Sequence, residues 1–323
     1  MAERFIDAPA LRESVSCKVG LVGPSGAGKT TSALLMAYGI CGDWRKILMV
    51  DTEGDSGTHP CGQEFDGVRV PGGEGCPPDQ TFRRLSLAPP YHPGRMVDVI
   101  KQYEDERAPD GSFAVDVLIW DSLSHVWNGA GGTLEQVDKL GSQSGWKTMT
   151  PLFRKFIDAL RLSRLHVVAT MRTKTEMEYV TKTDEAGKSK VVEIKKLGLK
   201  AVMRDDVDYE FTTIIRLDMN HLGTADKDRT REFSDRPPAI IGVEAGRIMA
   251  AWSRGGVSQV GSPSWMESKL DILANYAGSL DGLRTLWAGV AQHRARIPNE
   301  VWDRLFAAKE EGKARLIKLG RTE

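Results

Sequence analysis

Residues 23–30 read Gly23-Pro24-Ser25-Gly26-Ala27-Gly28-Lys29-Thr30, and this stretch fits the phosphate-binding pattern G-x-x-x-x-G-K-[ST] at every position. A β-prone segment, residues 15–22, comes before it, and an apolar helix-forming segment, residues 31–38, comes after it. Strand, glycine loop and helix is the context that the pattern needs in order to bind phosphate. The sequence therefore predicts a nucleotide-binding loop near the start of the fold.

Each part of this loop has an expected role. The glycines let the backbone wrap closely around phosphates, whose charge then rests on free N–H groups at a helix N-terminus. We expect Lys29 to reach the β and γ phosphates and the Thr30 hydroxyl to hold Mg²⁺. The predicted nucleotide-binding residues are Gly23, Pro24, Ser25, Gly26, Ala27, Gly28, Lys29, Thr30 and Thr31.

Bulk composition indicates a globular protein in a reducing compartment. The chain has 323 residues, enough for about two domains, and its 41% hydrophobic and 27% charged content is ordinary for such proteins. Formal charge balances to zero, so attraction to nucleic acid has to come from local patches. The four cysteines form no C-x-x-C pair, which favours a cytoplasmic location. We expect no signal peptide and no membrane segment.

Apolar runs that alternate with helical patterns predict the core. Residues 46–51, 115–121 and 165–170 are typical of buried parallel strands, and residues 94–107 and 152–162 have helical periodicity. This alternation favours parallel pairing with right-handed crossovers and a site at the carboxyl ends of the strands. The expected fold class is α/β, with a mainly parallel sheet between helices.

The remaining segments predict loops, a hairpin and a small helical domain. Residues 52–93 are rich in Gly and Pro and are expected to form surface loops, and the polar residues 172–204 are expected to include a hairpin. Three further helical segments are predicted at residues 265–276, 280–293 and 298–319. The predicted domains are an N-terminal arm (1–14), a nucleotide-binding core (15–252), a linker (253–264) and a helical C-terminal domain (265–323).

Acidic residues end two of the predicted strands. Asp121 closes an apolar strand downstream of the glycine loop, where a carboxylate can hold Mg²⁺ through its water shell. Asp51 and Glu53 close the preceding strand, and a carboxylate there can face the γ phosphate and orient the attacking water.

A small GTPase is one alternative. Asp51-Thr52-Glu53-Gly54 fits the D-x-x-G motif of that class, and Thr181-Lys182-Thr183-Asp184 fits its base-reading motif. However, Asp51 follows Lys29 too closely to leave room for a switch loop and an intervening strand. Thr181 also lies in the polar hairpin and not at the end of a buried strand. These two facts argue against the GTPase interpretation.

Taken together, the pattern resembles the RecA-like ATPase core over residues 15–252. In that family the strand after the glycine loop ends in Asp-x-Glu, and the resemblance implies that Glu53 activates water. Asp121 resembles the metal-binding strand end of the family. Thr170 stands where the family carries its γ-phosphate sensor, often Gln.

A second element of the resemblance concerns assembly. Lys227-Asp228-Arg229 resembles the K-x-[KR] element that reaches into the nucleotide site of the neighbouring subunit in that family. The resemblance implies that Lys227 and Arg229 act as catalytic residues on the nucleotide of a neighbouring copy. A residue supplied by a neighbour requires self-assembly into a ring or a filament.

The nearest resemblance is to phage-encoded RecA-core ATPases of single-strand annealing and recombination. It implies ATP and Mg²⁺ as cofactors, DNA-stimulated ATP hydrolysis, single-stranded DNA and a single-strand-binding protein as partners, and the cytoplasm of a bacterial host. The segment after the sensor strand matches by position the loop that such proteins use against DNA. The expected DNA-binding residues are Lys174, Lys182, Lys188, Lys190, Lys195, Lys196 and Lys200.

Two other functions stay open on the sequence. A P-loop kinase for a nucleoside or another small molecule would place its lid and acceptor pocket in residues 52–93. A non-catalytic nucleotide switch or loader would recruit a replication partner through the C-terminal helices.

Overall fold

The computed structural model describes residues 14–183, 189–255, 263–276, 279–291, 294, 297 and 299–320. It has two compact units, Ser16–Ser253 on the one hand and Met1–Val15 with Arg254–Glu323 on the other. Within the described residues, no helix combines the length and the apolar character that crossing a membrane requires.

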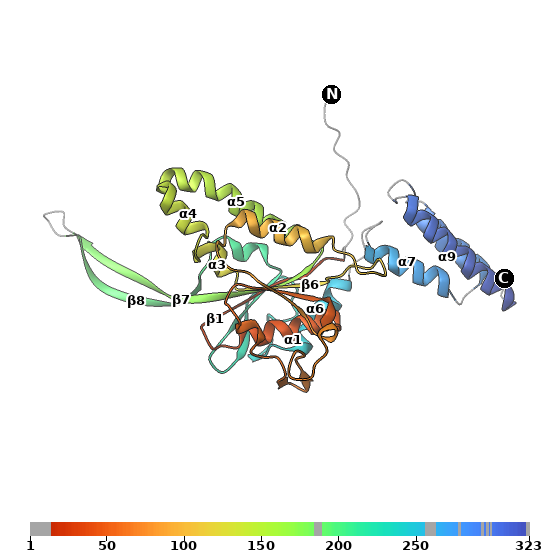
Figure 1. The fold of residues 1–323 in the computed structure, drawn as a ribbon, viewed down its shortest axis with the longest axis horizontal. Coiled ribbons are helices and arrows are strands. Elements are labelled where there is room, and N and C mark those ends of the chain that lie inside the picture. The colour runs from red at the N-terminus through yellow and green to blue at the C-terminus, as the bar shows by residue number, and fades with distance from the viewer. Residues whose placement is uncertain are drawn as a thin grey trace, which may run out of the picture. The chain divides into compact units, whose positions relative to one another are not determined.

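The larger unit is built on one mostly parallel sheet (Figure 1). Its strands follow the order β11-β10-β9-β1-β7-β6-β2-β5, in which β10 pairs antiparallel with both β9 and β11 and the strands from β9 to β5 pair in parallel. This arrangement confirms the expected α/β fold. The strands are β1 (Lys18–Gly23), β2 (Ile47–Asp51), β5 (Arg83–Ser86), β6 (Val117–Asp121), β7 (His166–Thr183), β9 (Thr213–Leu217), β10 (Leu222–Asp228) and β11 (Ala239–Ile240).

Helices cover both faces of this sheet and enclose two hydrophobic cores. Helices α1 (Lys29–Cys41) and α6 (Val243–Arg254) pack on one face, and α2 (Pro93–Glu104) and α5 (Ser142–Leu162) pack on the other (Figure 1). A Cβ atom on Gly39 of α1 would lie 2.1 Å from the carbonyl oxygen of Val243. Glycine at this position therefore lets α1 and α6 touch through their backbones.

Several elements were missing from the sequence prediction. Strand β5 lies within residues 52–93, which were predicted as loops, and α3 (Ser124–Asn128), α4 (Thr133–Leu140) and the first ten residues of α5 were not expected. A Cβ atom on Gly145 of α5 would lie 2.4 Å from the carbonyl oxygen of Val137. The polar start of α5 is thus stabilised by close packing on α4, which periodicity does not reveal.

Short elements fill the connections. The two strands β3 and β4 form a small antiparallel pair within residues 52–93. The short elements are η1 (Trp44–Lys46), η2 (Ser56–Thr58), β3 (Glu64–Phe65), β4 (Val68–Arg69), η3 (Pro78–Gln80) and η4 (Val207–Glu210).

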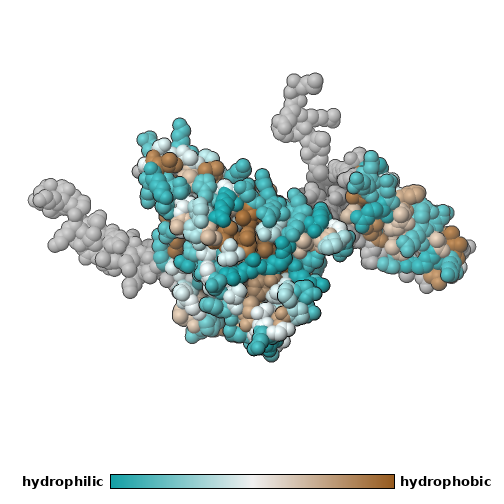
Figure 2. Space-filling model, in the orientation of Figure 1, coloured by the Kyte–Doolittle hydropathy of each residue, from teal (hydrophilic) through white to brown (hydrophobic). Residues whose placement is uncertain are grey.

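Apolar residues are exposed at the end of the α4–α5 pair, where Leu140 and Trp146 are 48% and 39% exposed (Figure 2).

Strand β7 is longer than predicted. Its first part pairs with β1 and β6 in the sheet, and it continues without a break into an antiparallel hairpin with β8 (Ser189–Ala201). The hairpin register runs from Thr173 opposite Ala201 to Thr183 opposite Ser189. The hairpin expected within residues 172–204 is therefore present, and residues 184–188 between its strands lie outside the described residues.

The smaller unit is helical, as expected. The helices among its described residues enclose a core of their own that includes Leu273, Leu283, Val290, Leu305 and Leu316. The helices are α7 (Pro263–Asn275), α8 (Leu280–Ala291) and α9 (Asn299–Lys318).

Candidate active site

The glycine loop connects β1 to α1 at the carboxyl edge of the sheet. Gly26 and Gly28 have φ values of 83° and 82°, in the left-handed region that favours glycine. Gly28 is the residue before α1, so the first N–H groups of that helix face the loop. The Lys29 amine is folded back onto the loop and donates a hydrogen bond to the carbonyl oxygen of Pro24 at 2.8 Å.

The electrostatics of Lys29 show which groups share its surroundings. Burial lowers the pKa of Lys29, and the charges of Glu53 and Asp121 raise that pKa in part. The guanidinium of Arg172 lowers the pKa of Lys29 further. Lys29 therefore lies within the electrostatic field of Glu53, the predicted catalytic acid, and of Asp121, the predicted Mg²⁺ ligand. The ends of β1, β2 and β6 thus contribute to one candidate site.

Asp121 accepts two hydroxyl hydrogen bonds at the end of β6. The Thr30 hydroxyl donates to Asp121 Oδ2 at 2.8 Å, and the Thr170 hydroxyl donates to Asp121 Oδ1. Burial raises the pKa of Asp121, and these two hydrogen bonds oppose the rise. A buried carboxylate beside a hydroxyl is a pair of hard oxygen donors, and such donors fit Mg²⁺. Thr170 is fully buried, and its sensor role stays a prediction.

Asp51 and Glu53 separate into two different environments. Asp51 is 1% exposed, pairs with Arg84 at 2.9 Å and accepts a hydrogen bond from the backbone N–H of Glu53 at 2.9 Å. It therefore fixes the turn after β2. Glu53 is the acid of this turn whose charge raises the pKa of Lys29.

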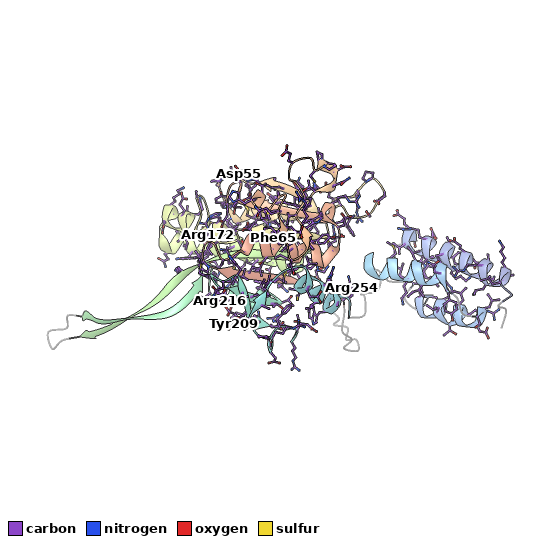
Figure 3. All side chains as sticks on the ribbon, turned by 90° about the horizontal axis from the view of Figure 1, so that it is seen from below. Asp55, Phe65, Arg172, Tyr209, Arg216 and Arg254 are labelled. Atoms are coloured by element: carbon purple, nitrogen blue, oxygen red, sulfur yellow. The ribbon has the colours of Figure 1, made fainter. Side chains whose placement is uncertain are left out.

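Arg172 occupies the root of the β7–β8 hairpin, at the edge of the core (Figure 3). Its Nε donates to Glu53 Oε1 at 2.7 Å, and its backbone N–H donates to the Ser124 hydroxyl at 3.0 Å. Burial raises the pKa of Glu53, but the hydrogen bond and charge of Arg172, together with the charges of His125 and Lys29, bring the pKa below its ordinary value. No motif in the sequence predicts this contact for Arg172, which lies at the start of the polar segment 172–204.

A hydrogen-bonded cluster holds the residue before Glu53, and sequence reasoning missed it. The Thr52 hydroxyl lies 2.8 Å from His125 Nδ1, and its carbonyl oxygen accepts from the Tyr91 hydroxyl at 3.0 Å. The rings of Tyr91 and His125 are stacked with centroids 5.1 Å apart. Burial lowers the pKa of His125, and the charge of Arg172 lowers it further. No motif in the sequence signals these contacts.

Lys227 and Arg229 lie away from Lys29. Lys227 pairs in register with Ile214 near the start of β9, whereas the glycine loop follows the end of the parallel neighbour β1. Lys227 Nζ donates to the carbonyl oxygen of Asp208 at 2.5 Å, and Arg229 donates to that of Tyr209 at 2.7 Å. Their role at a neighbouring subunit stays a prediction.

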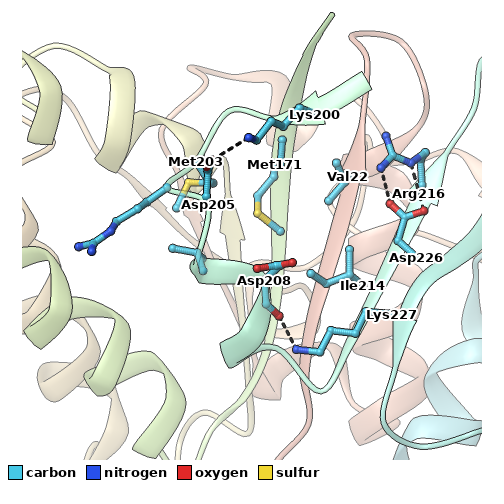
Figure 4. A pocket seen from close by; sticks show the side chains of 13 residues that line it. Val22, Met171, Lys200, Met203, Asp205, Asp208, Ile214, Arg216, Asp226 and Lys227 are labelled. Atoms are coloured by element: carbon cyan, nitrogen blue, oxygen red, sulfur yellow. Dashed lines mark hydrogen bonds and ion pairs between the residues drawn. The ribbon is translucent and has the colours of Figure 1, made fainter. Parts of the chain in front are cut away.

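Lys227 borders a cleft of about 320 Å³ on the α5 side of the sheet (Figure 4). Apolar residues that include Val22, Met171 and Ile214 line the cleft together with charged groups. An ion pair between Arg216 and Asp226 lies on one side of it.

The predicted DNA-binding residues fall on or beside the hairpin. Lys174 is exposed on β7, and Lys200 at the end of β8 pairs with Asp205 at 2.9 Å. Lys182, Lys190, Lys195 and Lys196 belong to the two hairpin strands. Lys188 lies outside the described residues.

The glycine loop joins β1 to α1, a buried acid ends β6, and β7 lies between β1 and β6 in the sheet. Together these features define a P-loop ATPase. A family model described as an AAA domain matches residues 16–237, well over half of the chain, and the chain belongs to this family. None of the curated proteins matches the chain.

Proposed function

We propose that this P-loop ATPase hydrolyses ATP with Mg²⁺ while acting on single-stranded DNA in homologous recombination or strand annealing of the phage type. The observation that carries the proposal is the course of β7, which passes from the nucleotide site into the hairpin without a break. Arg172 lies at this junction and bonds to Glu53. A ligand on the hairpin thus has a direct structural connection to the acid that aligns water.

The residues at the site divide the work of phosphoryl transfer. The backbone of residues 23–30 and the Lys29 amine neutralise the phosphates, and Glu53 orients the attacking water. Thr30 and Asp121 would hold Mg²⁺ through oxygen atoms. A bound Mg²⁺ supplies neutralisation of the charge that develops on the transferred phosphoryl group.

The sequence of the hairpin supports DNA as the ligand. Residues 172–204 contain nine lysines and arginines and five acids, an excess of four positive charges in a chain whose total charge is zero. Lysine contacts to phosphates are salt-sensitive and independent of base sequence. Both properties suit a protein that has to bind any single strand.

Assembly of several copies forms part of the proposal. Lys227 and Arg229 lie toward the amino end of β9, so they serve a nucleotide on a neighbouring copy and not the one on their own chain. Contacts of this kind are head-to-tail and generate a ring or a filament. A single-strand-binding protein is the further partner that we propose.

The test is ATP hydrolysis measured with and without single-stranded DNA over a range of salt concentrations. We expect DNA to raise the wild-type rate, and the double variant Lys182→Ala/Lys190→Ala to lose much of this stimulation. These two residues are register partners in the hairpin. Loss of two phosphate contacts should flatten the slope of log affinity against log salt by about 1.4.

The matched control is Lys101→Ala/Lys155→Ala, which removes two exposed lysines from α2 and α5. This variant should keep both the stimulation and the salt slope. An ATPase that is indifferent to single-stranded DNA at low salt would remove the recombination function from the proposal. Transfer of the phosphoryl group to an acceptor other than water would indicate a kinase.

A further inference from the structure

The turn between β9 and β10 lies directly beside the glycine loop. A Cβ atom built on Gly28 would lie 3.1 Å from His221 Nδ1, and one built on Gly26 would lie 3.8 Å from Met219 Cε. A Cβ atom on Gly23 would lie 2.8 Å from the carbonyl oxygen of Leu217. The end of β9 and its turn therefore follow the loop along most of its length.

Internal hydrogen bonds hold this turn in shape. Asp218 Oδ1 accepts from the backbone N–H groups of Asn220 and Leu222 at 2.8 and 2.9 Å. The backbone N–H of His221 donates to the carbonyl oxygen of Asp218 at 3.1 Å. His221 has a φ of 63°, a left-handed conformation that few residues other than glycine adopt. The turn thus presents the exposed imidazole and the 62% exposed Met219 side chain from a defined backbone.

The position of the acids fixes the direction of a bound triphosphate. Glu53, Asp121 and Arg172 follow or end β2, β6 and β7, and all three strands lie on one side of β1 in the sheet. Strand β9 is the neighbour of β1 on the other side. Because the γ phosphate has to face the acids, the sugar and base of a nucleotide in the loop extend toward β9.

We propose that the β9–β10 turn is the nucleoside subsite of this ATPase, in which His221 and Met219 contact the sugar and base of a nucleoside triphosphate. This proposal rests on the proposed function, because it requires a nucleotide in the glycine loop. The flat imidazole offers a stacking face, and the polarizable Met219 thioether packs on an aromatic ring. Every base has a π-face, so these contacts stabilise adenine and guanine to a similar degree.

The test compares ligands with and without a nucleoside. Binding of ATP, GTP and inorganic tripolyphosphate is measured by calorimetry on the wild type and on Met219→Ala/His221→Asn. Asparagine tolerates the left-handed conformation of residue 221, so the turn keeps its shape. We expect about tenfold weaker binding of ATP and GTP by the double variant, from the loss of base stacking. Binding of tripolyphosphate should be unchanged.

Two control variants separate this proposal from the function on which it rests. Asn220→Ala changes an exposed side chain of the same turn and should bind all three ligands like the wild type. Lys29→Ala should lose all three. Wild-type affinity for ATP in the double variant, or an equal loss for ATP and tripolyphosphate, overturns the nucleoside subsite alone. A wild type that binds none of the ligands overturns the proposed function as well.

Discussion

The Nε of Arg172 donates a hydrogen bond to Oε1 of Glu53 at 2.7 Å, across two strands, β7 and β2, that are separated by β6. Arg172 is also the register partner of Gly23, the residue that ends β1 before the glycine loop. Arg172 therefore connects the predicted water-activating acid through its side chain and the start of the phosphate loop through its backbone, at the root of the hairpin.

Removal of this guanidinium should change the pH dependence of hydrolysis. Arg172 keeps the pKa of Glu53 low against the effect of burial, so Arg172→Ala should raise that pKa. Since Glu53 aligns water only as a carboxylate, the acidic limb of the rate profile should move to higher pH. Arg172→Lys keeps the charge and should show a smaller displacement. Identical acidic limbs in the wild type and Arg172→Ala would show that the ion pair does not control Glu53.

Replacement of Asp121 should lower the rate of hydrolysis without lowering the stability of the fold. Burial of its carboxylate is costly, although Thr30 and Thr170 donate hydrogen bonds to it. Asp121→Asn removes the charge and keeps the shape, so hydrolysis should fall by about 100-fold. The thermal unfolding midpoint without Mg²⁺ should be equal or higher. Asp98→Asn, at an exposed position of α2, is the control. Wild-type activity in Asp121→Asn would contradict the assignment of this residue to Mg²⁺.

Lys18 should make the folded state more stable at higher pH. Burial lowers its pKa from 10.5 to about 7, and its amine donates to the carbonyl oxygens of Ser163 and Leu165. Between these two pH values the unfolded chain binds the proton and the folded chain increasingly does not. The free energy of unfolding therefore rises with pH from this group, by at most about 1.4 kcal/mol per pH unit, and is flat below pH 7.

Urea unfolding of the wild type and Lys18→Met at several pH values from 7 to 10 measures this contribution. The variant should lose the rise, whereas Lys101→Met, at an exposed position of α2, should keep it. Equal slopes in the wild type and Lys18→Met would refute the depressed pKa.

Local pattern was enough to predict the centre of the fold. The glycine loop, the apolar strands that end at Asp51 and Asp121, and the helical C-terminal unit each depend on residues that are neighbours in sequence. Strand β5 could not be predicted in this way, because it is short, lies at the edge of the sheet and contains two adjacent arginines. Its Arg84 forms an ion pair with Asp51, a tertiary contact that no periodicity encodes.

The sequence predicts the acids and the lysine of the candidate site, but it does not predict the groups that contact them. Glu53 and Arg172 are 119 residues apart in sequence, and only the register of the sheet brings them together. The contacts of Thr52 with His125 and Tyr91 likewise join three separate segments. The proximity of His221 to Gly28 follows from the pairing of β9 with β1 and has no local signature.

The central claim is that Lys29, Glu53 and Asp121 act on a single triphosphate. ATP binding and hydrolysis by Glu53→Gln, side by side with the wild type and with Asp55→Asn as the control for a nearby exposed acid, test this claim most directly. We predict that Glu53→Gln binds ATP with wild-type affinity and hydrolyses it at least about 100-fold more slowly. Hydrolysis by Glu53→Gln at the wild-type rate would contradict the claim.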